Sequence, residues 1–362
     1  MNDLTRLLSI LAIKRGHKSI GEATAVERYL APYDPMLYTD LKTKDVLAYV
    51  IVTDPSSKTL FSCHVDTVHA PSDDPDSMQN LVVYDANLGI AYKDATDPTP
   101  LGADDGAGWW LMLEMIDAGV KGTYIFHRGE ECGGIGSKGM ADNYTPLLKT
   151  FDRAIAFDRR STTSVITSQG WSGECASDEF ATALAARLNQ ADDTFAFEPD
   201  PTGIYTDTAE YAHLIPECTN LSCGYDSEHS KNETLDVDFL VKLRDACLTI
   251  DWETLPVKRD HTITPSRYDW STTYHLSSYS RGKSSKKKSS IPVDEFEVAA
   301  MTTKQAVAYC RKYPEDAAYM LLDLADKLME LYEKNEADTA SEQFIDDEFL
   351  FNHDSAYYAS HP

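Results

Sequence analysis

The chain has 362 residues, of which 42% are hydrophobic and 25% charged, so its composition is that of a globular protein with one large or two modest domains. The formal net charge of −26 argues against nucleic acid as a partner, because phosphates would be repelled over most of the surface. No apolar run is long enough to span a bilayer, and residues 1–14 lack a signal-peptide cleavage site, so we expect a cytoplasmic protein with no membrane partner. The seven cysteines are odd in number and form no CxxC pair, which argues against a disulfide framework or a cysteine-bound zinc.

The N-terminal part of the chain predicts helices followed by buried strands. Apolar residues at spacings of three and four predict helices over residues 2–14 and 20–31. Residues 45–53 are a nearly continuous apolar run, which is typical of a buried strand. A Pro-Ser turn separates this run from a second strand over residues 59–63. Helices and buried strands in this arrangement indicate an α/β fold.

Polar residues with ligand chemistry follow the second strand. His64 comes directly after it and Asp66 two residues later, on the same side of the chain. Open α/β sheets bind ligands at the carboxyl ends of their strands, so His64 lies where a metal ligand is expected. Metal-bound histidines usually donate their second N–H to a carboxylate, which makes Asp66 the candidate support for His64. Taken alone, the pair is equally compatible with an ordinary strand-end turn.

The sequence Gly102-Ala103-Asp104-Asp105-Gly106 lies between a surface insertion and a helix. Residues 70–100 are rich in Pro, Asp and Asn and contain a short hairpin, and residues 109–118 are an apolar helical run. Glycines allow a tight turn, and the helix dipole favours an acid at the start of the helix. A carboxylate placed there can direct both oxygens at one spot, as a bridge between two metal ions requires. An ordinary N-cap is the alternative.

The next predicted strand covers residues 122–127 and leads into Glu130 and Glu131, which are flanked by glycines. Adjacent residues of an extended chain point in opposite directions, so the two acids can divide the work. One carboxylate can bind a metal ion while the other stays free as a base. Solvated loop acids are the ordinary alternative, but the flanking glycines and the strand end favour a site.

Two more candidates follow strands. Residues 151–157 form a predicted strand that ends at Asp158, whose alternative role is a salt bridge with the arginines that follow it. A short strand and turn over residues 219–225 precede His229, the second histidine just past a strand. Histidines and carboxylates at the same edge of a sheet suit zinc, and a bridging carboxylate suits a pair of metal ions.

The chain divides into three parts. A helix predicted over residues 235–252 closes a domain that we place at residues 1–255. Residues 256–292 contain prolines, a Ser/Tyr-rich run and a lysine cluster, and they are predicted to form a linker or mobile loop. Residues 293–362 are predicted to form a helical extension with an acidic tail, because their apolar residues form a helical stripe.

These motifs together resemble the co-catalytic zinc exopeptidases, which include leucyl aminopeptidases, bacterial tripeptidases, carboxypeptidase G and aminoacylase. Five pieces match in the family's order: His64-Val65-Asp66-Thr67-Val68, Gly102-Ala103-Asp104-Asp105, Gly129-Glu130-Glu131, Phe157-Asp158 and His229-Ser230-Lys231-Asn232-Glu233. The resemblance implies a three-layer α/β/α fold with a mixed, mostly parallel central sheet in the domain at residues 1–255. It does not extend to the C-terminal helical extension.

The resemblance also implies a site. It implies two zinc ions, with cobalt or manganese as substitutes, on five side chains: His64 and Asp158 on one ion, Glu131 and His229 on the other, and Asp104 bridging both. Glu130 would take a proton from the metal-bound water and return it to the leaving amine. Asp66 would support His64.

The implied activity is hydrolysis of short peptides. An aspartate at the position of Asp158 is associated with the aminopeptidases of the family, so we expect removal of N-terminal residues. The alternatives are an N-acyl amino acid amidohydrolase or carboxypeptidase on the same metal site, and a non-catalytic binding protein on this fold. The sequence leaves the oligomeric state open.

Overall fold

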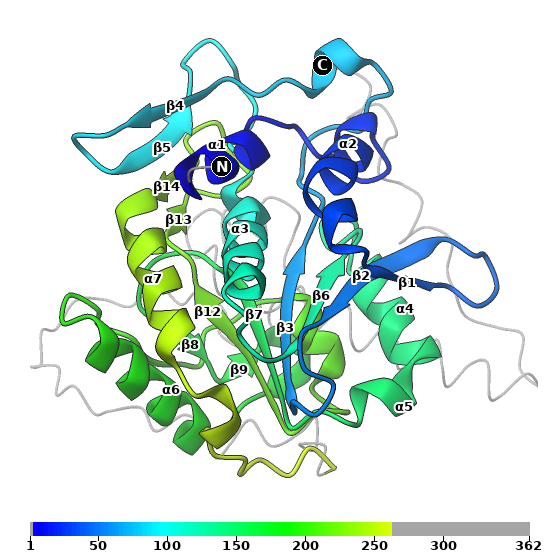
Figure 1. Cartoon of the computed structure of the whole chain (residues 1–362), viewed down its shortest axis with the longest axis vertical. Helices are drawn as coiled ribbons and strands as arrows, with labels where there is room; N and C mark the ends of the chain where they lie inside the picture. The colour runs from blue at the N-terminus through cyan, green and yellow to red at the C-terminus, as the bar shows by residue number, and fades with distance from the viewer. Residues whose placement is uncertain (1–2, 263–362) are drawn as a thin grey trace, which may run out of the picture. The chain divides into compact units, whose positions relative to one another are not determined.

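The computed structural model describes residues 3–262 of the chain. Its centre is an eight-stranded sheet with the strand order β1-β2-β6-β3-β7-β12-β8-β11 (Figure 1). The strands of this sheet are β1 (Met36–Thr39), β2 (Val46–Val52), β3 (Thr59–His64), β6 (Thr123–His127), β7 (Arg153–Arg159), β8 (Ser164–Ile166), β11 (Glu198–Asp200) and β12 (Glu217–Ser222). The predicted helical extension over residues 293–362, and the predicted linker from residue 263 onwards, lie outside the described residues.

The sheet is mixed, with a parallel centre. β6, β3, β7 and β12 are neighbours that pair in parallel. β1 and β2 form an antiparallel hairpin at one edge, and β8 pairs antiparallel with β12 towards the other. The three-layer α/β/α fold with a mixed, mostly parallel sheet that the sequence predicted is confirmed for the described residues. The connection between Asp158 and His229 contributes β8, β11 and β12 to this sheet.

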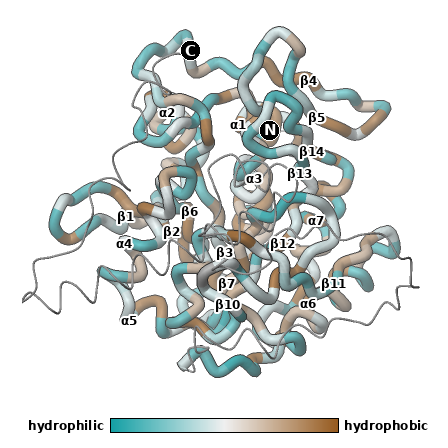
Figure 2. Tube along the Cα trace, turned by 180° about the vertical axis from the view of Figure 1, so that it is seen from behind, coloured by the Kyte–Doolittle hydropathy of each residue, from teal (hydrophilic) through white to brown (hydrophobic). Residues whose placement is uncertain are grey.

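Helices cover both faces of the sheet (Figure 1). One face carries α1 (Asp3–Leu11), α3 (Ala103–Asp117), α6 (Asp178–Ala191) and α7 (Val237–Thr249), and the other carries α4 (Ile135–Asn143) and α5 (Thr145–Leu148). Each face has its own cluster of buried apolar side chains, and residues of α2 (Ile20–Tyr29) belong to the first. Figure 2 shows apolar positions along the central strand β3 and hydrophilic ones along the surrounding loops.

Helix α3 is the core helix of the domain. Its residues from Ala103 to Leu113 are all buried, because it lies between the sheet on one side and α1 and α7 on the other. A helix with apolar residues all round requires such a central position. Asp104 and Asp105 have non-helical backbone angles and are joined by a cis peptide, so the regular helix begins after them. The acidic turn therefore lies directly at its N-terminus, as predicted.

The predicted surface insertion over residues 70–100 is tied into a second sheet. Its hairpin consists of β4 (Val82–Asp85) and β5 (Ile90–Lys93), and β5 pairs with β14 (Thr234–Asp236). The order of this four-stranded sheet is β13-β14-β5-β4, where β13 is Tyr225–Asp226. The hairpin is thus a neighbour of the loop that carries His229, and it is part of a sheet instead of a separate surface insertion. A short pair, β9 (Ser168–Gln169) and β10 (Gly173–Glu174), completes the strands.

Most predicted elements are present with shifted ends. The helix predicted over residues 2–14 stops at Leu11, because Ile13 and Lys14 pair with residues 78 and 79 instead. The helix predicted over residues 20–31 is α2, whose N-cap Ser19 accepts a hydrogen bond from the backbone of Glu22. Among the described residues, no helix is long and apolar enough to cross a bilayer.

Candidate metal centre

The five predicted ligands converge at one edge of the central sheet. Strands β6, β3 and β7 are parallel neighbours, so their carboxyl ends lie side by side. His64 is the last residue of β3, Asp158 lies near the end of β7, and Glu131 follows β6. Asp104 stands at the start of α3, and His229 lies in the loop between β13 and β14. Five segments that are distant in the sequence thus supply one cluster.

The carboxylate of Asp104 faces a histidine with each of its oxygens. Oδ1 lies 3.1 Å from His64 Nε2, and Oδ2 lies 3.0 Å from His229 Nε2. Another carboxylate accompanies each histidine: Asp158 Oδ1 lies 3.5 Å from His64 Nε2, and Glu131 Oε1 lies 3.1 Å from His229 Nε2. These contacts define two half-sites that share Asp104: the His64 half-site, completed by Asp158, and the His229 half-site, completed by Glu131.

The protonation of His64 tests whether this cluster fits a metal ion. Its Nδ1 lies 3.0 Å from the carbonyl oxygen of Asp66, which can only accept, so Nδ1 carries the ring proton. Without a metal ion, a second ring proton on Nε2 satisfies the carboxylates of Asp104 and Asp158, which raise the pKa of His64; a bound cation would take the place of that proton. In the other half-site, buried Glu131 Oε1 is paired with His229 Nε2 at 3.1 Å. Ligand atoms of His64, Asp104 and Glu131 lie within 4.8 Å of one another, as do those of His64, Asp105 and Asp158, so these donor groups fit a metal ion.

The electrostatics of the cluster lead to the same conclusion. Burial and the charge of Asp104 raise the pKa of Asp158 and of Glu131 above their ordinary values. The carboxylates of Asp104 and Glu131 raise the pKa of His229 to about 11. Burial opposes charge on His64, but Asp158 and Asp104 still raise its pKa well above the ordinary value. Carboxylates outnumber basic groups here, so the cluster attracts positive charge of the kind that a divalent cation supplies.

Asp66 has backbone partners that the sequence did not predict. Its carboxylate accepts hydrogen bonds from the backbone N–H groups of Gly129 at 2.7 Å and of Glu130 and Glu131 at 3.3 Å each. Its Oδ1 is 3.8 Å from His64 Nδ1, which bonds to the Asp66 carbonyl oxygen instead. The Asp66 carboxylate lies within ion-pair distance of His64, and its support of His64 stays a prediction. The Asp66 side chain holds the loop that carries both glutamates, because that loop crosses over the end of β3.

Glu130 is the one predicted site residue without a contact to a histidine. Its side chain is half-buried, and within residues 3–262 its carboxylate makes no hydrogen bond or ion pair. Burial, with the negative charge of nearby Asp158, raises its pKa well above the ordinary value. The neighbouring Glu131 faces His229 while Glu130 stays free, which is the division of work that their adjacent positions predicted.

Asp158 is held by residues that the sequence did not reveal. Thr206 Oγ1 donates to Asp158 Oδ2 at 2.6 Å, and the Tyr225 hydroxyl donates to Oδ1 at 3.2 Å. The side-chain amide of Asn220 pairs with both the N–H and the carbonyl of Asp158, at the point where the register between β7 and β12 shifts. No local pattern marks these residues, because their role depends on which segments come to lie beside β7.

A buried polar cluster lies next to the metal-ligand cluster. His127 Nε2 is 2.6 Å from the Tyr211 hydroxyl, and its Nδ1 is 3.3 Å from Asp207 Oδ2. Burial lowers the pKa of His127 to about 3 and raises that of Asp207 to about 8, so both side chains are largely neutral near pH 7. The contacts join the segment after Thr206 to the end of β6, and they thereby hold the segment that supports Asp158.

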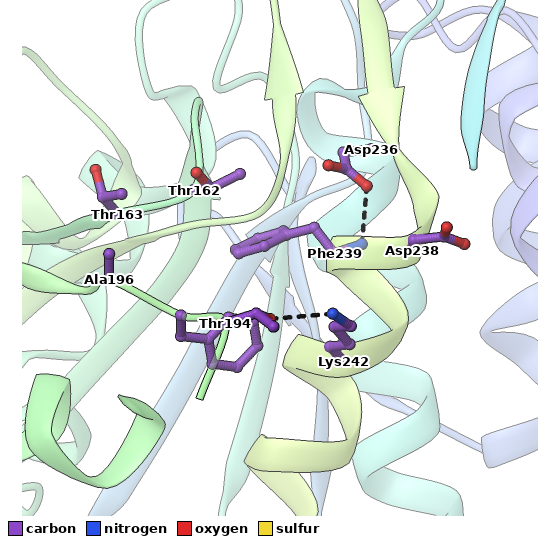
Figure 3. Close-up of a pocket in the computed structure, with 9 residues that line it drawn as sticks. Thr162, Thr163, Thr194, Ala196, Asp236, Asp238, Phe239 and Lys242 are labelled. Atoms are coloured by element: carbon purple, nitrogen blue, oxygen red, sulfur yellow. Dashed lines mark hydrogen bonds between the residues drawn. The ribbon is translucent and has the colours of Figure 1, made fainter. Parts of the chain in front are cut away.

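A cavity of about 260 Å³ lies away from this cluster. Its lining includes Thr162, Thr194, Phe239 and Lys242, and none of the predicted site residues (Figure 3). Two of its polar side chains have partners: Lys242 donates to Thr194 at 3.0 Å, and Asp236 caps α7 by accepting from the Phe239 N–H at 2.8 Å (Figure 3). These residues stabilise the start of α7 and give no sign of reaction chemistry.

No protein-family model matches the sequence, and no curated protein matches it either. Among solved structures, the aminopeptidase PepT from Bacillus cereus is 14% identical, over 68% of this chain and 96% of that chain, with a TM-score of 0.55. A tripeptidase from Staphylococcus aureus is also 14% identical, over 68% and 96%, with a TM-score of 0.52. An aminopeptidase from the archaeon Desulfurococcus kamchatkensis is 11% identical, over 68% and 93%, with a TM-score of 0.50.

Similarity at this level of identity shows a common fold. The chain therefore shares the fold of these solved aminopeptidases and the tripeptidase, in agreement with the fold that its motifs predicted. Similarity of fold does not establish what individual residues do. The metal-binding and catalytic roles of the candidate residues therefore stay predictions.

Proposed function

We propose that this protein is a metal-dependent aminopeptidase that removes N-terminal residues from short peptides. The observation that carries the proposal is the carboxylate of Asp104, whose two oxygens face His64 and His229 at 3.1 and 3.0 Å. One further acid in each half-site and an unpaired Glu130 beside them complete a set that suits a two-metal hydrolase. The shared fold with solved aminopeptidases and a tripeptidase supports the same class of reaction.

Zinc fits the donor set best. His64, Asp104 and Asp158 would hold one ion, and Asp104, Glu131 and His229 would hold the other, with cobalt or manganese as substitutes. Histidine nitrogens with carboxylate oxygens are the ligands of catalytic zinc sites. When bound, two such ions polarise a scissile carbonyl and lower the pKa of a water molecule.

The chain's own residues supply the proton transfers and the order of the site. Glu130 takes the proton of the attacking water and later gives it to the leaving amine. Asp66 holds the loop of Glu130 in place through three backbone N–H groups. Thr206 and Tyr225 orient Asp158. The described cysteines all have free thiols, as is usual in the cytoplasm, where we place the reaction.

The first test is the metal content of the purified full chain, together with its hydrolysis of free-amine and N-acylated di- and tripeptides with and without chelator. The proposal expects two zinc ions per chain and chelator-sensitive release of the N-terminal residue. Preference for N-acylated substrates would instead identify an amidohydrolase, and release from the carboxyl end a carboxypeptidase. Full metal content with no turnover on this panel would favour a binding protein.

The second test is Glu130→Gln. Loss of the base should lower kcat by about 100- to 10,000-fold while zinc content and KM stay near their wild-type values. Asp226→Asn, which alters an exposed acid in the turn before His229, is the matched control and should keep its activity. Undiminished kcat in Glu130→Gln with zinc bound would contradict the proposed mechanism.

A further inference from the structure

The turn that presents Asp104 is held at Gly102 by two buried ionisable side chains from distant parts of the chain, Arg15 and Glu233. Glu233 accepts hydrogen bonds from the backbone N–H of Gly102 at 2.9 Å and of Asp104 at 3.1 Å. On the opposite side of the same residue, Arg15 Nη2 donates to the Gly102 carbonyl oxygen at 2.9 Å. The turn is therefore held through its backbone, which leaves the Asp104 carboxylate free for the two half-sites.

Both gripping side chains are buried, so their hydrogen bonds are shielded from water. Glu233 is 1% exposed and Arg15 is fully buried. The guanidinium of Arg15 also donates to the carbonyl oxygens of Val65 at 3.1 Å and of Ile10 at 2.8 Å. Val65 lies between His64 and Asp66 in the chain, so Arg15 joins the end of β3 to the acidic turn. A charge-assisted bond in such surroundings is stronger than one between neutral groups.

We infer that Glu233 and Arg15 are positioning residues that set the bridging carboxylate of Asp104 against both half-sites. Glu233 follows His229 by four residues in the same loop, so its two bonds fix the distance between the His229 half-site and the shared Asp104. Arg15 does the same for the His64 half-site through Val65. This inference rests on the proposed two-metal function, whose ligands it serves.

The backbone at Gly102 shows why a clamp of this kind is required. Gly102 has a φ of 76°, a left-handed conformation that glycine adopts without steric cost. A Cβ there would lie 3.2 Å from Thr67 Cγ2. Glycine permits this turn, but it also leaves the backbone of the turn flexible. The hydrogen bonds from Arg15 and to Glu233 restrict that backbone. Asn80 adds to the grip by donating to the neighbouring carbonyl of Leu101 at 2.8 Å.

Glu233→Gln is the sharpest perturbation, because it keeps the shape and removes one acceptor. The amide has one oxygen for two backbone donors, so one of the Gly102 and Asp104 N–H groups loses its partner. Arg15→Lys is the second variant, since it keeps the charge but loses the fork that reaches Gly102 and Val65 together. Glu217→Gln is the control: Glu217 is equally buried and accepts backbone N–H groups, but it starts β12 at the opposite end of that strand from the cluster.

The measurement is calorimetric titration of the metal-free full chain with zinc, with urea unfolding of the same metal-free samples. Glu233→Gln and Arg15→Lys should each weaken zinc binding by about 10- to 100-fold, the usual effect of residues that orient ligands. Glu217→Gln should lower the unfolding midpoint without changing zinc affinity. A purely structural role would lower the midpoint in all three variants and leave zinc affinity unchanged, which would overturn the inference.

The outcomes separate this inference from the proposed function. A wild-type chain that binds no zinc would remove the proposed function, whatever the variants do. A wild-type chain that binds two zinc ions, with Glu233→Gln and Arg15→Lys binding equally well, would overturn the clamp and leave the function standing. If neither variant folds, the two residues serve the fold as a whole, and the positioning role is likewise overturned.

Discussion

The ion pair between Glu22 and Arg128 offers a prediction whose size follows from the structure. Arg128 donates to both carboxylate oxygens of Glu22, at 2.9 Å from Nε and 2.6 Å from Nη2, and the Glu22 side chain is 1% exposed. The Lys18 N–H adds a third hydrogen bond at 2.7 Å. Burial alone would raise the pKa of Glu22, but the bonds to Arg128 and other donors lower it to about 2.

The lowered pKa of Glu22 means that its ionised carboxylate stabilises the folded state. A fall from the ordinary value of 4.5 to about 2 corresponds to about 3 kcal/mol of unfolding free energy when the carboxylate is ionised in both states. Because the folded-state pKa is the lower one, this stabilisation is complete above pH 4.5 and disappears as the pH falls towards 2. Glu22→Gln should therefore lower the unfolding free energy by about 3 kcal/mol at pH 7 and by progressively less below pH 4.5.

Urea unfolding of wild type and Glu22→Gln at several pH values between 7 and 2.5, with chelator present, measures the difference without a contribution from bound metal. Asp45→Asn is the control, because the ion pair of Asp45 with Lys18 is 3.9 Å long and largely exposed, and its loss should have little effect. A difference for Glu22→Gln that is below about 1 kcal/mol at pH 7, or that stays constant down to pH 2.5, would refute the reasoning.

Two further predictions concern the core and the surface. Gly108→Ala should destabilise the chain by about 1–3 kcal/mol or more, because its Cβ would overlap the carbonyl oxygen of Phe157 and push α3 away from β7. Urea unfolding of wild type and Gly108→Ala checks this. Cys132 is exposed, while the other five described cysteines are buried. The number of thiols per chain that react rapidly with a thiol reagent should therefore fall by one in Cys132→Ser. An unchanged count of rapidly reacting thiols in this variant would contradict the exposure of Cys132.

Local patterns in the sequence predicted which residues carry the site chemistry. His64 and Asp158 follow apolar runs that could only be buried strands, so their place at strand ends is a local property. Glu130 and Glu131 are adjacent, and side chains alternate in direction along an extended chain, so the sequence predicts that the two carboxylates face different partners. In the structure, Glu131 lies 3.1 Å from His229, and Glu130 is unpaired within the described residues. Glycine on both sides of Asp104 predicted the tight turn at a helix start.

Contacts between distant segments could not be predicted in this way. The carboxylate of Asp66 was expected to support His64 and lies 3.8 Å from its ring, but its hydrogen bonds to the backbone of the loop after β6 were not predicted from the sequence. The hairpin over residues 82–93 reads as an insertion, yet it pairs with β14 beside His229. In each case the order of the strands in the sheet determines which segments become neighbours, and local sequence patterns do not predict that order.

The sequence by itself determined the class of fold and the strand-end positions of His64 and Asp158, and it predicts different roles for Glu130 and Glu131. Only the tertiary structure decided what holds those ligands: Arg15 and Glu233 on the turn of Asp104, and Asn220 on Asp158. The physical reason is that apolar periodicity and turn chemistry act within a few residues. A buried hydrogen bond between residues 62 to 131 positions apart exists only because the sheet and its helices bring those backbones together.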